Sequence, residues 1–427
     1  MALSHARLGI ALLAAIAALF AAMPASAQAA PTVTDGGVQN NFPQGMVFSM
    51  TAQSGSTIEK VRLRYKILPD GTAAIAQPDF VPGMTVSTSF ELAGNDPPKI
   101  YLPPGTTIEY HWEVTDAAGN TGQTSTASFF YNDVRFDWKP VENSGITIYY
   151  YSGSDQNARD MLSTAVETIG SMSQLLGAHI SFPLKVWIYD NTQDMRPALA
   201  RRSATFEQSI TTAGVRVASD TVLVLGNVSF DTLRHELTHV VTAAAGESAL
   251  GTLPAWLDEG TAVYGQGDPG GYRSAIERAI GQGEVLSVPS ITSYPGDPAK
   301  VDLFYGEAWS LVKFLNDGYG PEKFAQLFAT IKKGKSIDDA LQAVYGFGQD
   351  GLEDQWRAAN GLPPRVTPEP TQPASAASPT TIGSNQTGQS NRSGGTSTGV
   401  IIAIAAGVMA LATLTAFAGM TIARRYR

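Results

Sequence analysis

The stretch Asp231–Gly246, DTLRHELTHVVTAAAG, constrains this chain more tightly than any other part of its sequence. Apolar residues recur in it at helical spacing, an aspartate stands in the first turn and a glycine ends it, so it is predicted to be an amphipathic helix. His235 and His239 are four positions apart and therefore lie one turn apart on the same face of that helix. Two imidazoles so placed can bind one zinc ion at about 2.0–2.1 Å each.

Glu236 lies one step round the same helix from His235. There its carboxylate reaches a water bound to the metal without becoming a ligand itself. A chain with only five histidines contains an HExxH pattern by accident on the order of once in several hundred sequences. The alternative interpretation is a helix whose histidines form hydrogen bonds in the core, and a third ligand would decide against it.

A candidate third ligand follows the first helix. The stretch 252–264, TLPAWLDEGTAVY, is predicted to be a second helix with Pro254 near its first turn. Its Glu259 comes 20 residues after His239, which leaves room for a loop that returns the second helix antiparallel to the first. Two histidines and one glutamate leave the fourth zinc position to water, as a catalytic site requires. Asp258 is the competing ligand, and Glu259 is preferred because its side chain reaches further.

These two motifs resemble those of the peptidase MA-like gluzincins, a family of zinc metallopeptidases. The family pattern is HExxH, a spacer near twenty residues, and then W-L-x-E-G-x-A-x-Y. The matching residues of this chain are Trp256, Leu257, Glu259, Gly260, Ala262 and Tyr264. The stretches 304–315 (FYGEAWSLVKFL) and 334–345 (GKSIDDALQAVY) match the family more loosely, so the resemblance covers roughly residues 135–360.

The resemblance implies a thermolysin-like α+β domain that hydrolyses peptide bonds. In this interpretation His235, His239 and Glu259 bind Zn²⁺, and Glu236 is the general base for a zinc-activated water. Relatives often stabilise the oxyanion with a tyrosine from a helix beyond the third ligand. Tyr305 is the candidate here, and a packing tyrosine is the alternative.

The sequence departs from the family pattern at two points. No G-x-M-E-N stretch precedes the first motif, so the exopeptidase recognition of aminopeptidase relatives is not supported. Thermolysin-type enzymes carry an aspartate four residues after the glutamate ligand, where this chain has Val263. The residue that orients an imidazole must therefore come from elsewhere in the chain.

Two domains are predicted ahead of the C-terminal segments. Residues 31–132 contain short alternating strands separated by turn residues, which indicates a small all-β sandwich of immunoglobulin or fibronectin type. Residues 133–362 are predicted to form the peptidase domain, an α+β fold with strands first and helices later, including a long amphipathic helix at 155–176. The strand predicted at 221–225 is interpreted as the sheet edge along which an extended substrate could pair.

The two ends of the chain predict export and anchoring. Residues 1–27 follow the pattern of a signal peptide. Residues 363–399 are rich in Pro, Ser, Thr and Gly and are predicted to be a disordered stalk. Residues 400–422 carry no charge and are predicted to be a transmembrane helix, with 423–427 as a short basic cytoplasmic tail. The predicted localisation is the cell membrane, single-pass, with an extracellular N-terminal ectodomain.

Composition excludes several classes of function. The net charge of −9 and the dispersed basic residues give no support to a nucleic-acid partner. The chain has no cysteine, which removes disulfides, thiolate metal sites and cysteine nucleophiles. The expected partners are a peptide or protein substrate and, through the C-terminal helix, a membrane, while no oligomeric state is specified. Three alternatives stay open: a catalytically degenerate domain serving as a cell-surface binding or adhesion protein, a chain whose β-sandwich carries the main role, and another kind of zinc hydrolase.

Overall fold

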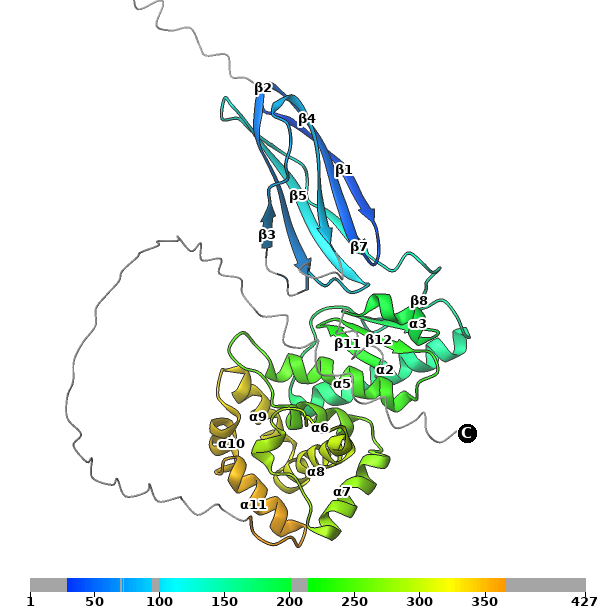
Figure 1. Cartoon of the computed structure of the whole chain (residues 1–427), viewed down its shortest axis with the longest axis vertical. Coiled ribbons are helices and arrows are strands. Elements are labelled where there is room, and N and C mark those ends of the chain that lie inside the picture. The colour runs from blue at the N-terminus through cyan, green and yellow to red at the C-terminus, as the bar shows by residue number, and fades with distance from the viewer. Residues whose placement is uncertain (1–28, 70, 72, 94–99, 201–213, 366–427) are drawn as a thin grey trace, which may run out of the picture. The chain divides into compact units, whose positions relative to one another are not determined.

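The computed structural model describes residues 29–69, 71, 73–93, 100–200 and 214–365 of the chain (Figure 1). These residues fall into two compact units. Of the described residues, unit 1 contains those before 140 together with 193–200, and unit 2 contains 140–192 and 214–365.

Unit 1 is all-β, as the sequence predicts. Its strands are β1 (Thr32–Asn40), β2 (Gly45–Leu68), β3 (Ala73–Ala76), β4 (Gly83–Ala93), β5 (Thr106–Asp116), β6 (Thr121–Gln123) and β7 (Ala127–Tyr131). The first half of the long strand β2 pairs with β1 and β4, its second half pairs with β3 and β5, and β5 pairs with β6 and β7. The strands therefore form one continuous sheet through β2, whereas the predicted sandwich has two separate sheets. Burial alternates along β5, so one face of this strand contributes to the core.

The sheet of unit 2 has five strands in the order β11-β12-β10-β9-β8. They are β8 (Lys139–Asn143), β9 (Ile146–Tyr150), β10 (Leu184–Tyr189), β11 (Gly214–Ala218) and β12 (Thr221–Leu225). β10 is parallel to β9 and β12, and β11 is antiparallel to β12. The prediction that β12 is the sheet edge is wrong, because every residue of this apolar strand is buried between β11 and β10. The edge beside β12 is formed by β11.

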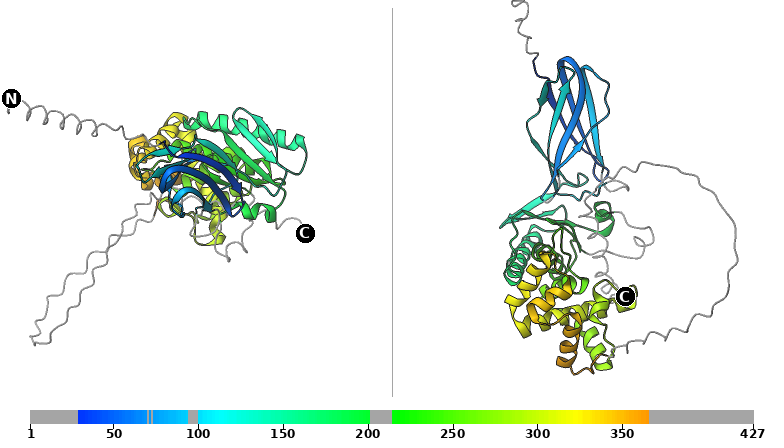
Figure 2. Two further views of the ribbon diagram at one scale, coloured as in Figure 1. Left: turned by 90° about the horizontal axis from the view of Figure 1, so that it is seen from above. Right: turned by 90° about the vertical axis from the view of Figure 1, so that its left-hand side faces the viewer.

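Two helices pack on this sheet: α2 (Asp155–Leu176) and α5 (Phe230–Gly246) (Figures 1 and 2). α2 begins where the Ser154 side chain accepts a hydrogen bond from the backbone N–H of Asn157 at 3.1 Å, and it ends at Gly177 in the left-handed conformation. An N-cap of this kind stabilises a helix by about 1 kcal/mol. Its bounds agree with the helix predicted from periodicity.

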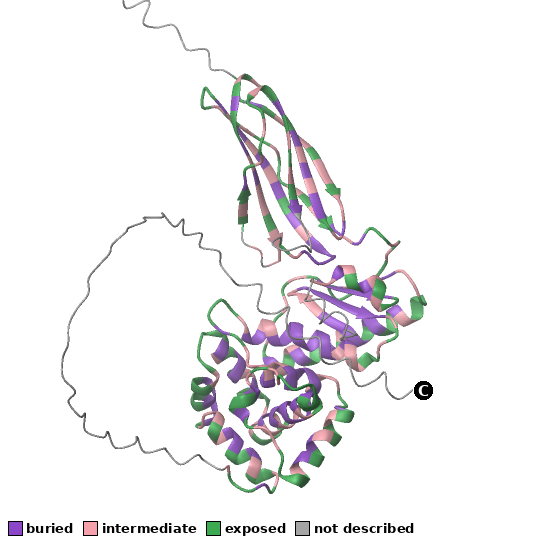
Figure 3. Cartoon of the chain, viewed as in Figure 1, coloured by how far each residue is buried: buried purple, intermediate pink, exposed green. Residues whose placement is uncertain are grey.

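The second half of unit 2 is helical. Its helices are α6 (Ala255–Gly265), α7 (Gly271–Gln282), α8 (Val301–Tyr319), α9 (Pro321–Lys332), α10 (Ile337–Tyr345) and α11 (Gln349–Ala359), with short 3-10 turns η2 (Val288–Ile291) and η3 (Pro298–Lys300) between α7 and α8. They share one hydrophobic core, visible as the buried faces of α5, α6 and α8 in Figure 3. α6 and α8 approach closely at Gly260, where a Cβ atom would lie 2.3 Å from the Ala308 carbonyl oxygen. A side chain at this position would force the two helices apart.

The remaining short elements are α3 (Thr192–Met195) and the 3-10 turn η1 (Arg196–Ala198). Most of this segment belongs to unit 1 although it follows β10 in the sequence. Within unit 1 the Tyr101 hydroxyl donates to the Ala198 carbonyl at 2.7 Å, and Arg135 Nη2 donates to the Asp194 carbonyl at 2.6 Å.

The predicted transmembrane helix, and the single-pass membrane localisation drawn from it, are corrected here. Among the described residues, no helix is both long enough and apolar enough to cross a bilayer. The two longest, α2 and α8, are amphipathic helices that carry several charged residues each. The stretch 400–422 lies outside the described residues, as do the predicted signal peptide, the tail 423–427 and all of the predicted stalk after residue 365.

Candidate metal centre

Helix α5 presents two faces to two different parts of unit 2. Leu233, Leu237 and Val240 pack towards the sheet, in the core that α5 shares with α2. His235 and His239 lie on the other face, directed towards α6. This division follows from the helical repeat, because residues 233, 237 and 240 share one side and residues 235 and 239 the opposite side. Both histidines are buried, with exposures of 3% and 1%.

The three predicted ligands meet at one point. His235 Nε2 lies 3.2 Å from His239 Nε2 and 3.2 Å from Glu259 Oε2, and the His239 Nε2 to Glu259 Oε2 distance is 3.5 Å. Glu259 comes from α6 and is fully buried. The group could hold a metal ion.

The donor set fits zinc in both geometry and chemistry. Tetrahedral zinc with ligand distances of about 2.0–2.1 Å separates its ligand atoms by about 3.3–3.4 Å, close to the three distances of this triangle. Two imidazole lone pairs and a carboxylate directed at one buried point repel, so a cation between them relieves an unfavourable arrangement. Nitrogen and carboxylate oxygen are also ligands that zinc accepts.

Each imidazole has a polar partner at its other nitrogen. His239 Nδ1 lies 3.1 Å from Asp258 Oδ1, and His235 Nδ1 lies 2.8 Å from the side-chain amide of Gln266. With the proton of each ring on Nδ1, both Nε2 lone pairs are directed at the triangle. The atom of Gln266 that faces His235 Nδ1 is the amide nitrogen Nε2, and turning the amide by 180° would place its oxygen there to accept the Nδ1 proton. Asp258 was the competing candidate for the third zinc ligand. In the structure it contacts the ligand His239 and orients its ring.

The carboxyl of Asp258 is strongly held in its ionised form. Burial alone would raise its pKa, but the neighbouring His239 and Arg216 and a hydrogen bond from the Thr242 hydroxyl at 2.5 Å lower the pKa to about 2. Arg216 comes from β11 and also lies 3.7 Å from Glu247. Asp258 is therefore negatively charged wherever the protein is folded near neutral pH.

Glu236 is buried beside the triangle with an exposure of 2%. Burial raises the pKa of its carboxyl above the usual value, the charge of Glu259 adds to this increase, and the two histidines oppose it. Its Oε2 accepts a hydrogen bond from the backbone N–H of Arg216 at 3.2 Å. The edge strand β11 thus holds the carboxylate in place, and a raised pKa is what a general base near neutral pH needs.

Tyr305 lies in α8, next to the metal triangle, and is fully buried. Its ring centroid is 6.2 Å from that of His235, and it stacks on Tyr272 of α7 at 5.0 Å. The hydroxyl has no hydrogen-bond partner among the described residues. Burial, with the nearby carboxylates, raises the pKa of this phenol well above its usual value. It therefore keeps its proton and can donate it to a group that enters the site.

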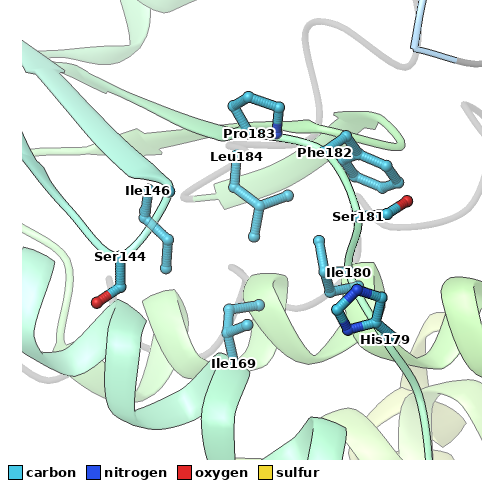
Figure 4. Close-up of a pocket in the computed structure, with 10 residues that line it drawn as sticks. Ser144, Ile146, Ile169, His179, Ile180, Ser181, Phe182, Pro183 and Leu184 are labelled. Carbon is cyan, nitrogen blue, oxygen red and sulfur yellow. The ribbon is translucent and has the colours of Figure 1, made fainter.

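A cavity of about 390 Å³ opens elsewhere in unit 2, where β9 and β10 begin (Figure 4). The side chains of Ile146, Ile169 and Leu184 gather around it, and His179 lies at its side. None of the predicted site residues lines this cavity. It is therefore separate from the metal triangle.

The sequence identified some members of this site and missed others. His235, Glu236, His239 and Glu259 come together as their spacing suggested, and Tyr305 lies beside them. Four contributors were missed: Gln266 as a partner of His235, Asp258 as the partner of His239, the backbone of Arg216, and Tyr294, whose hydroxyl donates to Glu259 Oε1. Of these four, only Asp258 could have been recognised from the sequence, because it directly precedes the preferred ligand Glu259. Tyr264, the last residue of the second motif, accepts a hydrogen bond from the Asn316 amide at 2.8 Å.

Unit 2 thus combines an α+β fold, an HExxH helix and a glutamate from the following helix, the arrangement of a gluzincin-like, peptidase-type domain. The family model of the Peptidase MA superfamily matches residues 164–360, from the middle of α2 to just beyond α11. This part of the chain is therefore similar to the Peptidase MA superfamily.

The chain is also similar to several solved structures, all at low identity. A mutant M1 zinc metallopeptidase from Deinococcus radiodurans matches 77% of this chain and 92% of its own, at 11% identity and a TM-score of 0.34. An aminopeptidase N family protein from Idiomarina loihiensis matches 73% of this chain and 74% of its own, at 10% identity and a TM-score of 0.34. A β-1,3-glucan-binding module of carbohydrate-binding family 56 matches 23% of this chain and 98% of its own, at 15% identity and a TM-score of 0.16. No curated protein matches the chain in sequence.

Proposed function

We propose that this protein is a zinc-dependent metallopeptidase that hydrolyses peptide bonds in a peptide or protein substrate. The observation that carries the proposal is the buried triangle of His235 Nε2, His239 Nε2 and Glu259 Oε2, with separations of 3.2, 3.2 and 3.5 Å. The similarity of residues 164–360 to the Peptidase MA superfamily supports it. A zinc ion held by these residues supplies a Lewis acid that polarises the scissile carbonyl and makes water more acidic.

Proton transfer falls to Glu236. Its buried carboxylate is held from β11 through the N–H of Arg216, so it has few ways to turn away from the site. As general base it removes a proton from the attacking water, and as general acid it then gives that proton to the leaving amine. Its raised pKa brings the carboxyl closer to neutral pH and makes both transfers easier.

Tyr305 is the proposed donor to the oxyanion. Its buried hydroxyl is protonated and has no other partner in the described part of the chain. A donor fixed beforehand in a site that excludes water stabilises developing negative charge without reorganisation. Asp258 and Gln266 have a supporting role, because they hold His239 and His235 with the nitrogen lone pairs aimed at the metal position.

The proposal is tested by measuring zinc content and peptide hydrolysis on the wild-type chain, on two site variants and on one control variant. Wild-type protein is expected to bind about one zinc per chain. Glu236→Gln keeps the hydrogen bond from Arg216 and the metal but loses about 10²–10⁴-fold in hydrolysis, because the amide takes up no proton. Glu259→Ala removes a ligand and releases zinc. Glu284→Gln makes the same chemical change at an exposed loop position and is expected to alter neither quantity.

Wild-type protein without zinc would contradict the metal site itself. Zinc binding without cleavage of a broad peptide library would contradict the catalytic part alone and point to a binding domain of peptidase type. Glu236→Gln with full activity would contradict the assigned general base.

A further inference from the structure

The two carboxylate oxygens of Glu259 have different surroundings. Oε2 faces the two imidazole nitrogens, at 3.2 and 3.5 Å. Oε1 instead accepts a hydrogen bond from the hydroxyl of Tyr294. We infer that Tyr294 is a positioning residue that keeps Glu259 a ligand through one oxygen only. This inference rests on the metal site proposed above and adds a residue that the HExxH and WLxEG motifs do not contain.

Tyr294 is itself held in place by the helix that carries Glu259. It lies in the segment between η2 and η3, and two residues before it the carbonyl of Thr292 accepts a hydrogen bond from the N–H of Ala255 at 2.9 Å. Ala255 is the first residue of α6. The segment therefore contacts α6 at its first residue and again at Glu259, so the hydroxyl and the carboxylate are placed by the same helix.

The ring of Tyr294 is fixed by packing. Its centroid lies 5.2 Å from that of Phe304, a fully buried residue of α8 next to Tyr305. An aromatic ring packed against the core in this way has little freedom at its two side-chain torsions, so its hydroxyl stays close to one position.

The chain just before this segment, at the start of η2, is anchored by two buried carboxyls. Glu307 Oε2 accepts from the N–H of Leu286 at 2.8 Å, and Glu353 Oε2 accepts from the N–H of Val288 at 3.0 Å. Both glutamates are almost fully buried, with exposures of 0% and 2%. Hydrogen bonds in a buried, low-dielectric environment are stronger than the same bonds in water. The chain around Tyr294 is therefore held at two places: before the segment by Glu307 and Glu353, and at Tyr294 itself by Glu259.

The chemical consequence concerns the number of ligand atoms. A carboxylate can bind a metal through one oxygen or through both, and a hydrogen bond to one oxygen favours the first mode. Binding through one oxygen leaves zinc with three protein ligand atoms and an open position, as catalysis requires. Without the tyrosine hydroxyl, Oε1 is free to turn towards the metal and to become an additional ligand atom beside the water, which would make the metal five-coordinate.

The test compares Tyr294→Phe with Tyr264→Phe in the full chain, loaded with zinc or with cobalt. Tyr264 is a matched control because it is also half-buried and its hydroxyl has one hydrogen-bond partner, Asn316, away from the ligands. Tyr294→Phe is expected to weaken zinc binding about 10–100-fold in competition with a chelator. It should also lower the visible absorption of the cobalt protein, since five-coordinate cobalt absorbs more weakly than four-coordinate cobalt. The control should leave the cobalt spectrum unchanged.

The outcomes separate this inference from the proposed function. If wild-type protein takes up neither metal, both are overturned. If wild-type protein binds metal, and Tyr294→Phe has the wild-type zinc affinity and cobalt spectrum, the role of Tyr294 alone is overturned. A changed cobalt spectrum in a Tyr294→Phe protein that unfolds at the same denaturant concentration as Tyr264→Phe supports the inference, even if wild-type protein cleaves no peptide.

Discussion

The two imidazoles of the metal triangle are oriented by chemically different partners. Asp258 is a charged acceptor at His239, whereas Gln266 is a neutral amide at His235. A carboxylate increases the basicity of the ring that it contacts more than an amide does. The two histidines should therefore differ in how much their partners contribute to metal binding.

Asp258→Asn is expected to weaken zinc binding about 10–100-fold while zinc content at saturation stays near one per chain. The substitution keeps the shape of the side chain and removes the charge that holds His239. Affinity is measured by competition with a chelator. Asp231→Asn, which removes a charge from the first turn of the same helix α5, serves as control and should change the affinity by less than about twofold. Equal affinities for the two variants would contradict the role given to Asp258.

Residues whose role depends on spacing along one helix could be predicted from the sequence. His235, Glu236 and His239 follow from an i, i+4 pattern, and Glu259 follows from a second motif close by in sequence. Gln266 and Tyr294 could not be predicted in this way. Gln266 reaches the site only because α6 lies against α5, and Tyr294 reaches it through a loop with no periodicity. Their roles depend on how distant elements pack, which no local pattern records.

Among the secondary-structure elements, those with strong periodicity were the ones that sequence analysis located well. The bounds of α2 agree with the prediction at 155–176, and β12 lies at the predicted 221–225. The error concerned the place of β12 in the sheet. Its uninterrupted apolar run is typical of a strand buried on both faces. The true edge strand β11 has the same length but a less apolar sequence, and it was overlooked. Strand order is set by long-range pairing, which the sequence of one strand does not determine.

The segment between α7 and α8 should respond to pH through Glu307. Burial raises the pKa of this carboxyl to about 8, and the neighbouring Glu353 adds to the increase. In the unfolded chain the same group titrates near 4.5. Between these values the folded protein keeps a proton that the unfolded chain has lost. The contribution to stability is therefore complete below about pH 4.5 and is lost as the pH rises through 8.

Glu307→Gln should remove this dependence, because the amide is neutral at every pH and its oxygen can still accept from Leu286. The free energy of unfolding of wild-type protein is expected to fall relative to the variant between pH 5 and pH 9, by on the order of a few kcal/mol. Urea unfolding at several pH values measures the difference. Glu277→Gln, at an exposed position on α7, serves as control, and its free energy of unfolding should change with pH as that of wild type does. If the free energy of unfolding of Glu307→Gln changes with pH as that of wild type does, Glu307 is not a buried, protonated carboxyl.

For the whole molecule, the division into two units could be foreseen from the sequence only in part. The change from short strands to long helices near residue 133 indicated a β region followed by an α+β region. It did not indicate that residues 193–200 belong to unit 1, because this segment lies between two strands of the sheet of unit 2. A short passage of the chain from one unit into the other and back does not change the composition or the periodicity of the sequence.

Unit 2 is expected to fold and bind metal without the β-strands of unit 1. Its two hydrophobic cores, one beneath the sheet and one among the helices, consist entirely of residues between 146 and 362. A domain with complete cores of its own can unfold as a cooperative unit. A fragment covering residues 140–365 should therefore show one cooperative urea transition and bind about one zinc, like a chain covering 29–365. The same two proteins should be compared for peptide hydrolysis. Loss of hydrolysis with metal binding retained would mean that unit 1 contributes to the substrate site. An unfolded or metal-free fragment would mean that the cores of unit 2 are not sufficient.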